Sequence, residues 1–292
     1  MTSFNYRAQR GLAVIAPRVP ARIIVAACDA IGFFSRVVAR HSRRRVANNL
    51  DVVQPLTGRH RRRRTDRAVA NYARYWCEAF RLPACSPDEV RDGITVHGWE
   101  YVEHSLARGQ GTILALPHLG GWEWAGRWLA LRGVEVVAVA ERLDDDDVFG
   151  LHVGLRENVG IGVLALGPDT GREALAVLRR NGVLCLLSDR DLTGDGVPVS
   201  FFGHDTTIPG GAATLALRTG ASVLPTAVFT TGSGLGHLGL VRPPLDTSRS
   251  QGGLRTDVAR ITAHLTRELE LLIRSAPEQW HMFQQRFMTP AG

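Results

Sequence analysis

The chain has 292 residues, of which 45% are hydrophobic and 22% charged, so it has enough material for one sizeable globular domain, alone or with a small appendage. All 35 basic residues are arginine, because the sequence contains no lysine. This composition excludes Schiff-base lysine chemistry, pyridoxal chemistry and a Walker-type phosphate loop.

The positive charge is concentrated in the amino-terminal part of the chain. Residues 1–67 carry a net charge of +12, whereas residues 68–292 carry −5. Such a basic segment attracts phosphate, either of a nucleic acid or of an anionic bilayer. We therefore expect a basic amphipathic helical segment at 1–67 ahead of an α/β domain at 68–292, the two forming one continuous structural unit.

The sequence predicts neither a membrane span nor a metal site. The apolar run at residues 23–34 has 12 residues and contains Asp29, whereas a spanning helix needs about 20. The four cysteines are scattered without CxxC spacing, which indicates neither a zinc site nor a disulfide framework and suits a reducing cytosol.

Residues 20–50 have the pattern of an amphipathic helix. Pro20 suits a first-turn position, and apolar residues recur at helical spacing while arginines fill the remaining positions. A basic amphipathic helix is typical of membrane-surface binding, and a core-packing helix with a solvated basic end is the alternative. A second arginine run at 59–64 precedes a helix expected at 66–80.

From about residue 96 the sequence alternates between strand and helix patterns. Strands are expected at 112–116, 134–139, 163–166, 183–187, 222–229 and 237–241. Helices are expected at 121–131, 148–158, 169–180, 210–218 and 254–274. This alternation predicts an α/β fold with a mainly parallel central sheet flanked by helices.

The stretch GTILALPHLGGWE, residues 111–123, carries the first candidate site. His118 stands at the carboxyl end of an expected strand, and Glu123 falls in the first turn of the helix that follows Gly120 and Gly121. Open parallel sheets place ligands at this edge. A carboxylate beside an imidazole favours its acceptance of a proton, and no serine or cysteine nucleophile motif stands nearby. The pattern predicts a base that activates a substrate hydroxyl directly.

This stretch resembles the signature of glycerolipid-type acyltransferases, in which a histidine is followed after four residues by Asp or Glu. The resemblance is to the branch that contains the lipid A lauroyl/myristoyl acyltransferases and the actinobacterial phosphatidylinositol mannoside acyltransferases. It covers most of the chain from residue 70. Further matching segments follow in order at 140–142, at Arg156, and at 187–192, 201–203, 210–225 and 277–280. The all-arginine composition, the DRDLTG run and the arginine-rich helix look more similar to the mannoside acyltransferases.

The resemblance implies an acyl-CoA co-substrate, no other cofactor and no metal. It implies transfer of a long, palmitoyl-type acyl chain to a mannose hydroxyl of a phosphatidylinositol mannoside. The enzyme would be peripheral, on the anionic cytoplasmic face of the inner membrane.

The resemblance also implies roles for individual residues. His118 would be the general base for direct attack on the thioester, and Glu123 fills the family's acidic position. Which acid orients His118 stays open, because three others are candidates: Glu141, Asp189 and Asp191. The expected substrate-binding residues are Arg156 and Arg190.

Other functions are compatible with parts of the sequence. Within the family, the acceptor could instead be a lipid A-type glycolipid or a lysophospholipid. Asp189 and Asp191 form a DxD pattern, as in metal-dependent glycosyltransferases. A nucleic-acid binder would explain the arginine runs but not the His118 turn, so no nucleic-acid partner is expected. The aromatic residues Trp280, Phe283 and Phe287 suit core packing or the wall of an acyl groove.

Overall fold

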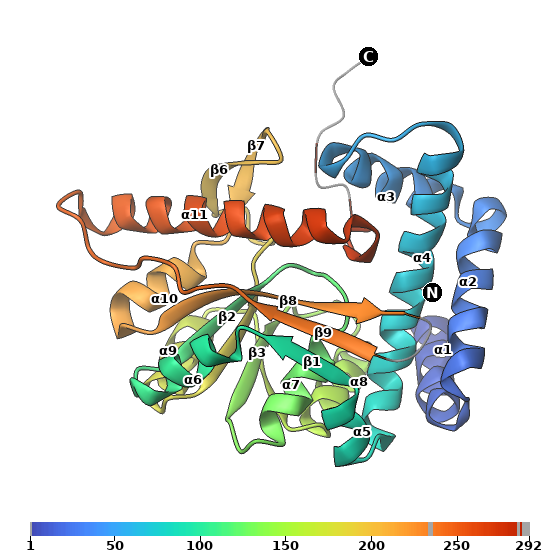
Figure 1. The fold of residues 1–292 in the computed structure, drawn as a ribbon, viewed down its shortest axis with the longest axis horizontal. Helices are drawn as coiled ribbons and strands as arrows, with labels where there is room; N and C mark the ends of the chain where they lie inside the picture. Colours follow the sequence, from blue (N-terminus) through green and yellow to red (C-terminus); the bar gives the residue numbers. More distant parts are fainter. Residues whose placement is uncertain (1, 233–235, 285–286, 288–292) are drawn as a thin grey trace.

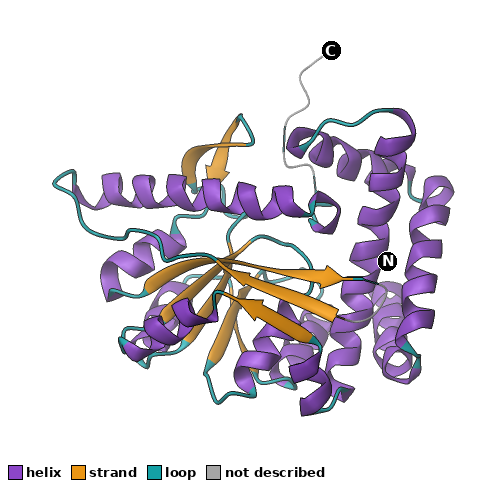
Figure 2. Ribbon diagram, viewed as in Figure 1, coloured by secondary structure: helices purple, strands orange, loops and turns teal. Residues whose placement is uncertain are grey.

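A seven-stranded sheet forms the centre of the molecule (Figures 1 and 2). The computed structural model describes residues 2–232, 236–284 and 287. The strand order is β1-β9-β8-β2-β5-β3-β4, and each neighbouring pair is parallel except β8 with β9. The strands are β1 (Ile94–His97), β2 (Thr112–Leu116), β3 (Val136–Ala140), β4 (Ile161–Ala165), β5 (Val183–Leu187), β8 (Ser222–Thr231) and β9 (Gly236–Val241). The prediction of a mainly parallel sheet is confirmed.

Helices cover both faces of this sheet, because its central strands are apolar on both sides. Along β2, Ile113 and Ala115 join the core under α9, α10 and α11, whereas Leu114 and Leu116 join the core under α5, α6 and α7. Alternate residues of a strand point to opposite faces, so a continuously apolar strand suits a three-layer structure. The helices are α5 (Pro87–Asp92), α6 (Trp99–Ala107), α7 (Trp122–Ala130), α8 (Asp146–Glu157), α9 (Thr170–Arg179), α10 (Gly211–Thr219) and α11 (Gly253–Ser275).

A separate hairpin of β6 (Val197–Phe201) and β7 (His204–Ile208) lies outside the sheet, next to α11 (Figure 1). Phe202 and Gly203 form its turn, and both have positive φ. This combination is typical of a two-residue hairpin turn.

Four helices from the amino-terminal part of the chain stand at one end of the sheet (Figure 1). They are α1 (Thr2–Ile15), α2 (Ala21–Val38), α3 (Arg40–Val53) and α4 (Gly58–Arg81). The prediction of a single helix at 20–50 is wrong, because the helix is interrupted at Ala39 between α2 and α3. α4 begins earlier than expected and continues unbroken across residues 67 and 68.

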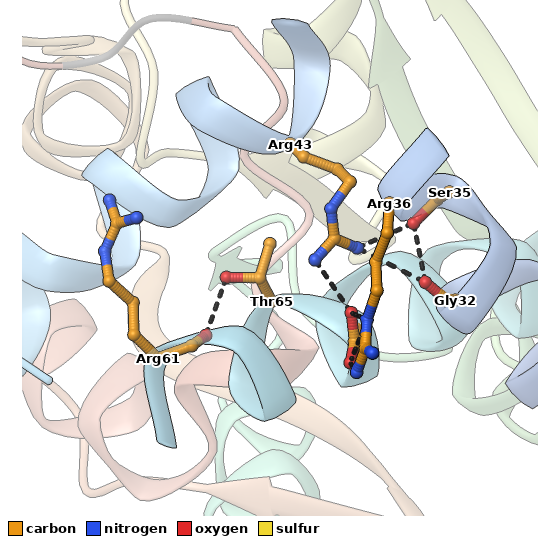
Figure 3. A network of polar contacts seen from close by, with 7 residues as sticks. Gly32, Ser35, Arg36, Arg43, Arg61 and Thr65 are labelled. Carbon is orange, nitrogen blue, oxygen red and sulfur yellow. Dashed lines mark hydrogen bonds and ion pairs between the residues drawn. The ribbon is translucent and has the colours of Figure 1, made fainter. Parts of the chain in front are cut away.

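Part of the basic charge of this segment binds the helices together. The guanidinium groups of Arg36 and Arg43 both contact Asp66, and Arg43 also donates to the hydroxyl of Ser35 at 2.7 Å (Figure 3). Arg61 and Arg64 pair with Asp51 in the same way, at 2.5 and 2.7 Å. These four arginines therefore stabilise the packing of α2, α3 and α4. Other arginines of this segment are exposed: Arg22, Arg40, Arg44, Arg45, Arg59, Arg62, Arg63 and Arg67.

Within the described part of the chain, no helix is long and apolar enough to cross a bilayer.

Candidate active site

His118 and Asp189 meet at the carboxyl edge of the sheet because of strand register. β2 and β5 are parallel neighbours, and their last residues, Leu116 and Leu187, are register partners. His118 follows Leu116 by two residues, and Asp189 follows Leu187 by two residues. The two side chains consequently lie side by side, with Nδ1 of His118 2.5 Å from Oδ1 of Asp189.

Asp189 is completely buried and ionised. Its Oδ2 accepts the backbone N–H of His118 at 3.0 Å and the indole N–H of Trp280 at 2.7 Å. Burial by itself would raise the pKa of the Asp189 carboxyl, but the charge and hydrogen bond of His118, together with the bond from Trp280, lower it to about 2. The carboxylate is therefore charged at every pH at which the protein would work.

This contact determines which nitrogen of His118 is available to a substrate. A carboxylate can only accept, so Nδ1 carries the hydrogen and Nε2 of the neutral ring holds the lone pair. The His118 side chain is 27% exposed and lines a cavity, whereas Asp189 lies behind it. The arrangement is that of a base oriented by a buried acid.

The turn after His118 is held by backbone contacts on both sides. The N–H of Gly120 donates to the carbonyl of Gln279 at 3.1 Å, and that of Gly121 donates to Val228 at 3.2 Å. Gly120 has a φ of +60°, and a β-carbon there would lie 1.8 Å from the carbonyl oxygen of Val228. Glycine is therefore required at position 120 by both conformation and space.

Glu123 has partners other than His118. Its Oε1 accepts the hydroxyl of Tyr75 at 2.7 Å and a guanidinium N–H of Arg156 at 2.9 Å, and the carboxylate is almost completely buried. The expectation that Glu123 contacts the ring of His118 is therefore wrong. Glu123 stands in the first turn of α7 and ties that helix to α4 and α8, while Asp189 makes the contact with the ring.

The other predicted residues form separate groups. Arg190 pairs with Glu141, and both side chains line the cavity. Arg156 also lines it, with its charge balanced by Glu123. Their roles in substrate binding stay predictions.

Asp191 bonds to its own loop and to strand β7. Its Oδ1 accepts the N–H of Gly194 at 2.9 Å, and its Oδ2 accepts the hydroxyl of Thr207 at 2.7 Å. Among the contacts of the described residues, none joins Asp191 or Glu141 to the ring of His118. Over residues 2–232, 236–284 and 287, no group of three or more His, Cys, Asp or Glu is placed to hold a metal ion.

The cavity beside His118 has a volume of about 770 Å³, within the range of about 300–1,000 Å³ typical of ligand pockets. Much of its wall is apolar, including aromatic side chains of α4, α7 and α8: Tyr72, Tyr75, Trp76, Trp122 and Phe149. Leucines from the sheet, loops and helices add to it: Leu143, Leu166, Leu175, Leu186 and Leu215. The cavity therefore suits a ligand with a long apolar part and a reactive group near His118.

The carboxyl-terminal segment adds two residues to the site. Trp280 is 1% exposed and donates its indole N–H to Asp189, and His281 lines the cavity. The N–H of His281 donates to the carbonyl of His118 at 2.7 Å, and burial lowers the pKa of the His281 ring to about 4, so the ring is neutral at pH 7. The PEQW match to the acyltransferases was a sequence signal for this segment, although it did not reveal the contact with Asp189.

Replacing Trp280 with phenylalanine should lower the free energy of unfolding at pH 7 by about 1.5–3 kcal/mol, because a buried carboxylate loses a hydrogen bond. Urea unfolding measures the loss. Trp128→Phe, at another buried tryptophan, is the matched control for the change in ring size. An equal loss in the two variants would contradict a special role for the bond from Trp280 to Asp189.

Comparison with known proteins identifies the family to which the chain belongs. The sequence matches the family described as bacterial lipid A biosynthesis acyltransferase over residues 9–289. The phosphatidylinositol mannoside acyltransferase of Mycobacterium tuberculosis is 38% identical over 226 residues, which cover 76% of this chain and 69% of that protein. The protein of the same name from Mycolicibacterium smegmatis is 39% identical over 224 residues, 76% of this chain and 71% of that protein. The chain thus belongs to the family of bacterial lipid A biosynthesis acyltransferases and is an acyltransferase.

Proposed function

We propose that this acyltransferase moves a long, palmitoyl-type acyl chain from acyl-CoA to a mannose hydroxyl of a phosphatidylinositol mannoside. The observation that carries the proposal is the contact between His118 and Asp189 at the wall of an apolar cavity of about 770 Å³. The cavity suits an acyl chain. The names of the relatives from Mycobacterium tuberculosis and Mycolicibacterium smegmatis support the mannoside acceptor.

The chemistry follows from the free Nε2 of His118. This nitrogen takes the proton of the mannose hydroxyl as the oxygen attacks the thioester carbonyl, so that a carbon–oxygen bond forms. The carbon–sulfur bond then breaks, and the departing CoA thiolate receives the proton from His118. Asp189 keeps the ring in the required tautomer and stabilises the imidazolium that exists between the two steps. The reaction is a direct transfer within a ternary complex.

The acceptor can be tested with purified protein and palmitoyl-CoA. Mass spectrometry would follow product formation with a phosphatidylinositol mannoside, a lipid A precursor or a lysophospholipid as acceptor. The proposal predicts a product heavier by one acyl group with the mannoside, formed at least tenfold faster than with the other two. Faster acylation of either alternative acceptor would replace the proposed substrate.

We further propose that the protein is peripheral and binds the anionic cytoplasmic face of the inner membrane through α2. The side of α2 that packs inward carries Ile24, Cys28, Gly32 and Ser35. Most of its large apolar side chains, other than Ile24, are exposed instead: Ile23, Ile31, Phe33, Phe34, Val37 and Val38. An exposed apolar patch marks an interaction site, and nearby exposed arginines suit anionic lipid.

Replacing Phe34 and Val38 with glutamine should weaken binding to vesicles of phosphatidylcholine and phosphatidylglycerol by at least about tenfold, since each side chain loses its apolar burial in lipid. These residues are 64% and 84% exposed. Leu254→Gln with Leu271→Gln is the matched control, because both leucines are exposed on α11. Co-sedimentation measures binding. Equal binding by the two double variants and the unchanged protein would remove α2 from this account.

A further inference from the structure

A cluster of buried ionisable side chains lies directly behind the turn that follows His118. Arg74 and Glu78 come from α4, and His237 comes from β9. Nε of Arg74 is 2.5 Å from Oε1 of Glu78, and Nε2 of His237 is 3.1 Å from Oε2 of Glu78. All three side chains are at most 7% exposed. None of them takes part in the proposed chemistry.

The cluster fills the space beneath Gly121. A β-carbon at position 121 would lie 2.8 Å from Nε2 of His237 and 3.6 Å from Oε2 of Glu78. One face of the imidazole is also covered, because its ring stacks on Trp124 of α7 at 4.6 Å between centroids. The imidazole therefore contacts both the first turn of α7 and the residue that begins it, Gly121, so a shift of the ring would press on that residue.

Stability alone is a weak reason for this cluster. Burying an ion pair costs desolvation that apolar side chains of the same volume would avoid. In addition, Nδ1 of His237 is buried without a hydrogen-bond partner among the described residues, which is a further cost. What charged partners do provide is direction, because the carboxylate of Glu78 fixes the orientation of the imidazole through a directional contact.

We propose that Glu78 and His237 are positioning residues for acyl transfer, which set the place of the Gly121 peptide and through it the place of His118. This inference rests on the proposed function of His118. Gly121 is three residues from His118. The turn between them is tight, because the N–H of Leu119 donates to the carbonyl of Pro117 at 2.7 Å. A displacement of about 1 Å at a catalytic group can cost about 10²-fold in rate.

The decisive variant is Gly121→Ala, because it introduces a methyl group against His237 and Glu78. The φ of Gly121 is −111°, so alanine meets no left-handed strain there. We expect kcat to fall by about 10²-fold with KM for acyl-CoA within twofold of the unchanged protein. His237→Ala alone should lower kcat about tenfold.

The double variant Gly121→Ala, His237→Ala separates positioning from independent damage. Removing the imidazole makes room for the new methyl group, so the double variant should be no slower than Gly121→Ala. Independent effects would instead multiply to about 10³-fold, and that result would overturn the inference. Gly120→Ala is the control, since its methyl group would meet the carbonyl of Val228 and His237→Ala should not rescue it.

A second variant covers the case in which Gly121→Ala does not fold. Glu78→Gln keeps the shape of the side chain and removes its charge, and it should lower kcat per folded molecule about tenfold without changing KM. A lower melting temperature with kcat within twofold would mean a merely structural role and would overturn the inference. His118→Ala in the same assay tests the proposed function separately. If that variant stays active, the base assignment fails; if it is inactive while the Gly121 and His237 effects multiply, only the positioning role fails.

Discussion

Replacing His118 with alanine is expected to lower kcat for acyl transfer by about 10²–10⁴-fold, which is the usual contribution of a general base. The substrates should still bind, because the apolar cavity and Arg156 are unchanged, so KM for acyl-CoA should change less than threefold. Release of the CoA thiol, followed with a thiol-reactive dye, measures the rate.

The matched control is His104→Ala, at an exposed histidine of α6. It removes the same side chain and should leave kcat within twofold. Circular dichroism and the melting temperature show that both variants fold. A His118→Ala rate within tenfold of the unchanged protein would contradict the assignment of the base.

Replacing Asp189 with asparagine should be almost as damaging, on the order of 10²–10³-fold in kcat. An asparagine amide can donate to Nδ1 of His118, which favours the ring tautomer whose Nε2 carries hydrogen and cannot accept a proton. Asp191→Asn is the control within the same loop, and it should lose less than tenfold because the contacts of Asp191 are with its own loop and with Thr207 of β7, not with His118. The reverse order of the two effects would favour the glycosyltransferase reading of the DxD pattern.

The pH dependence of stability gives a second test of Asp189. Its pKa is about 2 in the fold, against an ordinary value of 3.8, so below pH 3.8 the unfolded chain binds more protons than the folded one. The stabilisation from this carboxylate is thus complete above pH 4 and is lost as the pH falls towards 2. Asp189→Asn should flatten the unfolding free energy over that interval. An unchanged slope would show that Asp189 is not ionised in the way described.

The centre of the sheet could be predicted because local and long-range forces agree there. β2 and β5 have the predicted bounds, since short apolar runs buried on both faces leave little choice of structure. Five elements of the α/β part were missed: the short edge strand β1, the hairpin strands β6 and β7, and the helices α5 and α6. These pack partly on the surface, and each of β6 and β7 has only one fully buried residue, Phe201 and Ile208.

The outward face of α2 shows the limit of periodicity. A helical spacing of apolar residues identifies a stripe, but it does not say what covers the stripe. Here three of the four buried residues, Cys28, Gly32 and Ser35, are small, and the close approach of Gly32 to Asp66 and Ala70 lets α2 lie against α4. Most of the large apolar residues of α2 consequently remain outside.

The position of His118 in the candidate site could be predicted from the sequence, but its contact with Asp189 could not. The pattern singled out His118 as the candidate base, which stays a prediction, and it placed Glu123 and Asp189 among several possible orienting acids. The equal offset of His118 and Asp189 from paired strand ends becomes visible only when the strand order is known. The contact of Trp280 with Asp189 could not be predicted, because it joins residues 91 positions apart in the sequence.

Direct transfer is the central claim, and the intact mass of the protein tests it most directly. The protein would be mixed with palmitoyl-CoA alone, sampled over several turnover times, and then given the mannoside acceptor. The account predicts an unmodified protein mass and little CoA release before the acceptor is added, followed by one CoA for each acylated mannoside. A protein heavier by one acyl group, with a matching burst of CoA before the acceptor arrives, would contradict it.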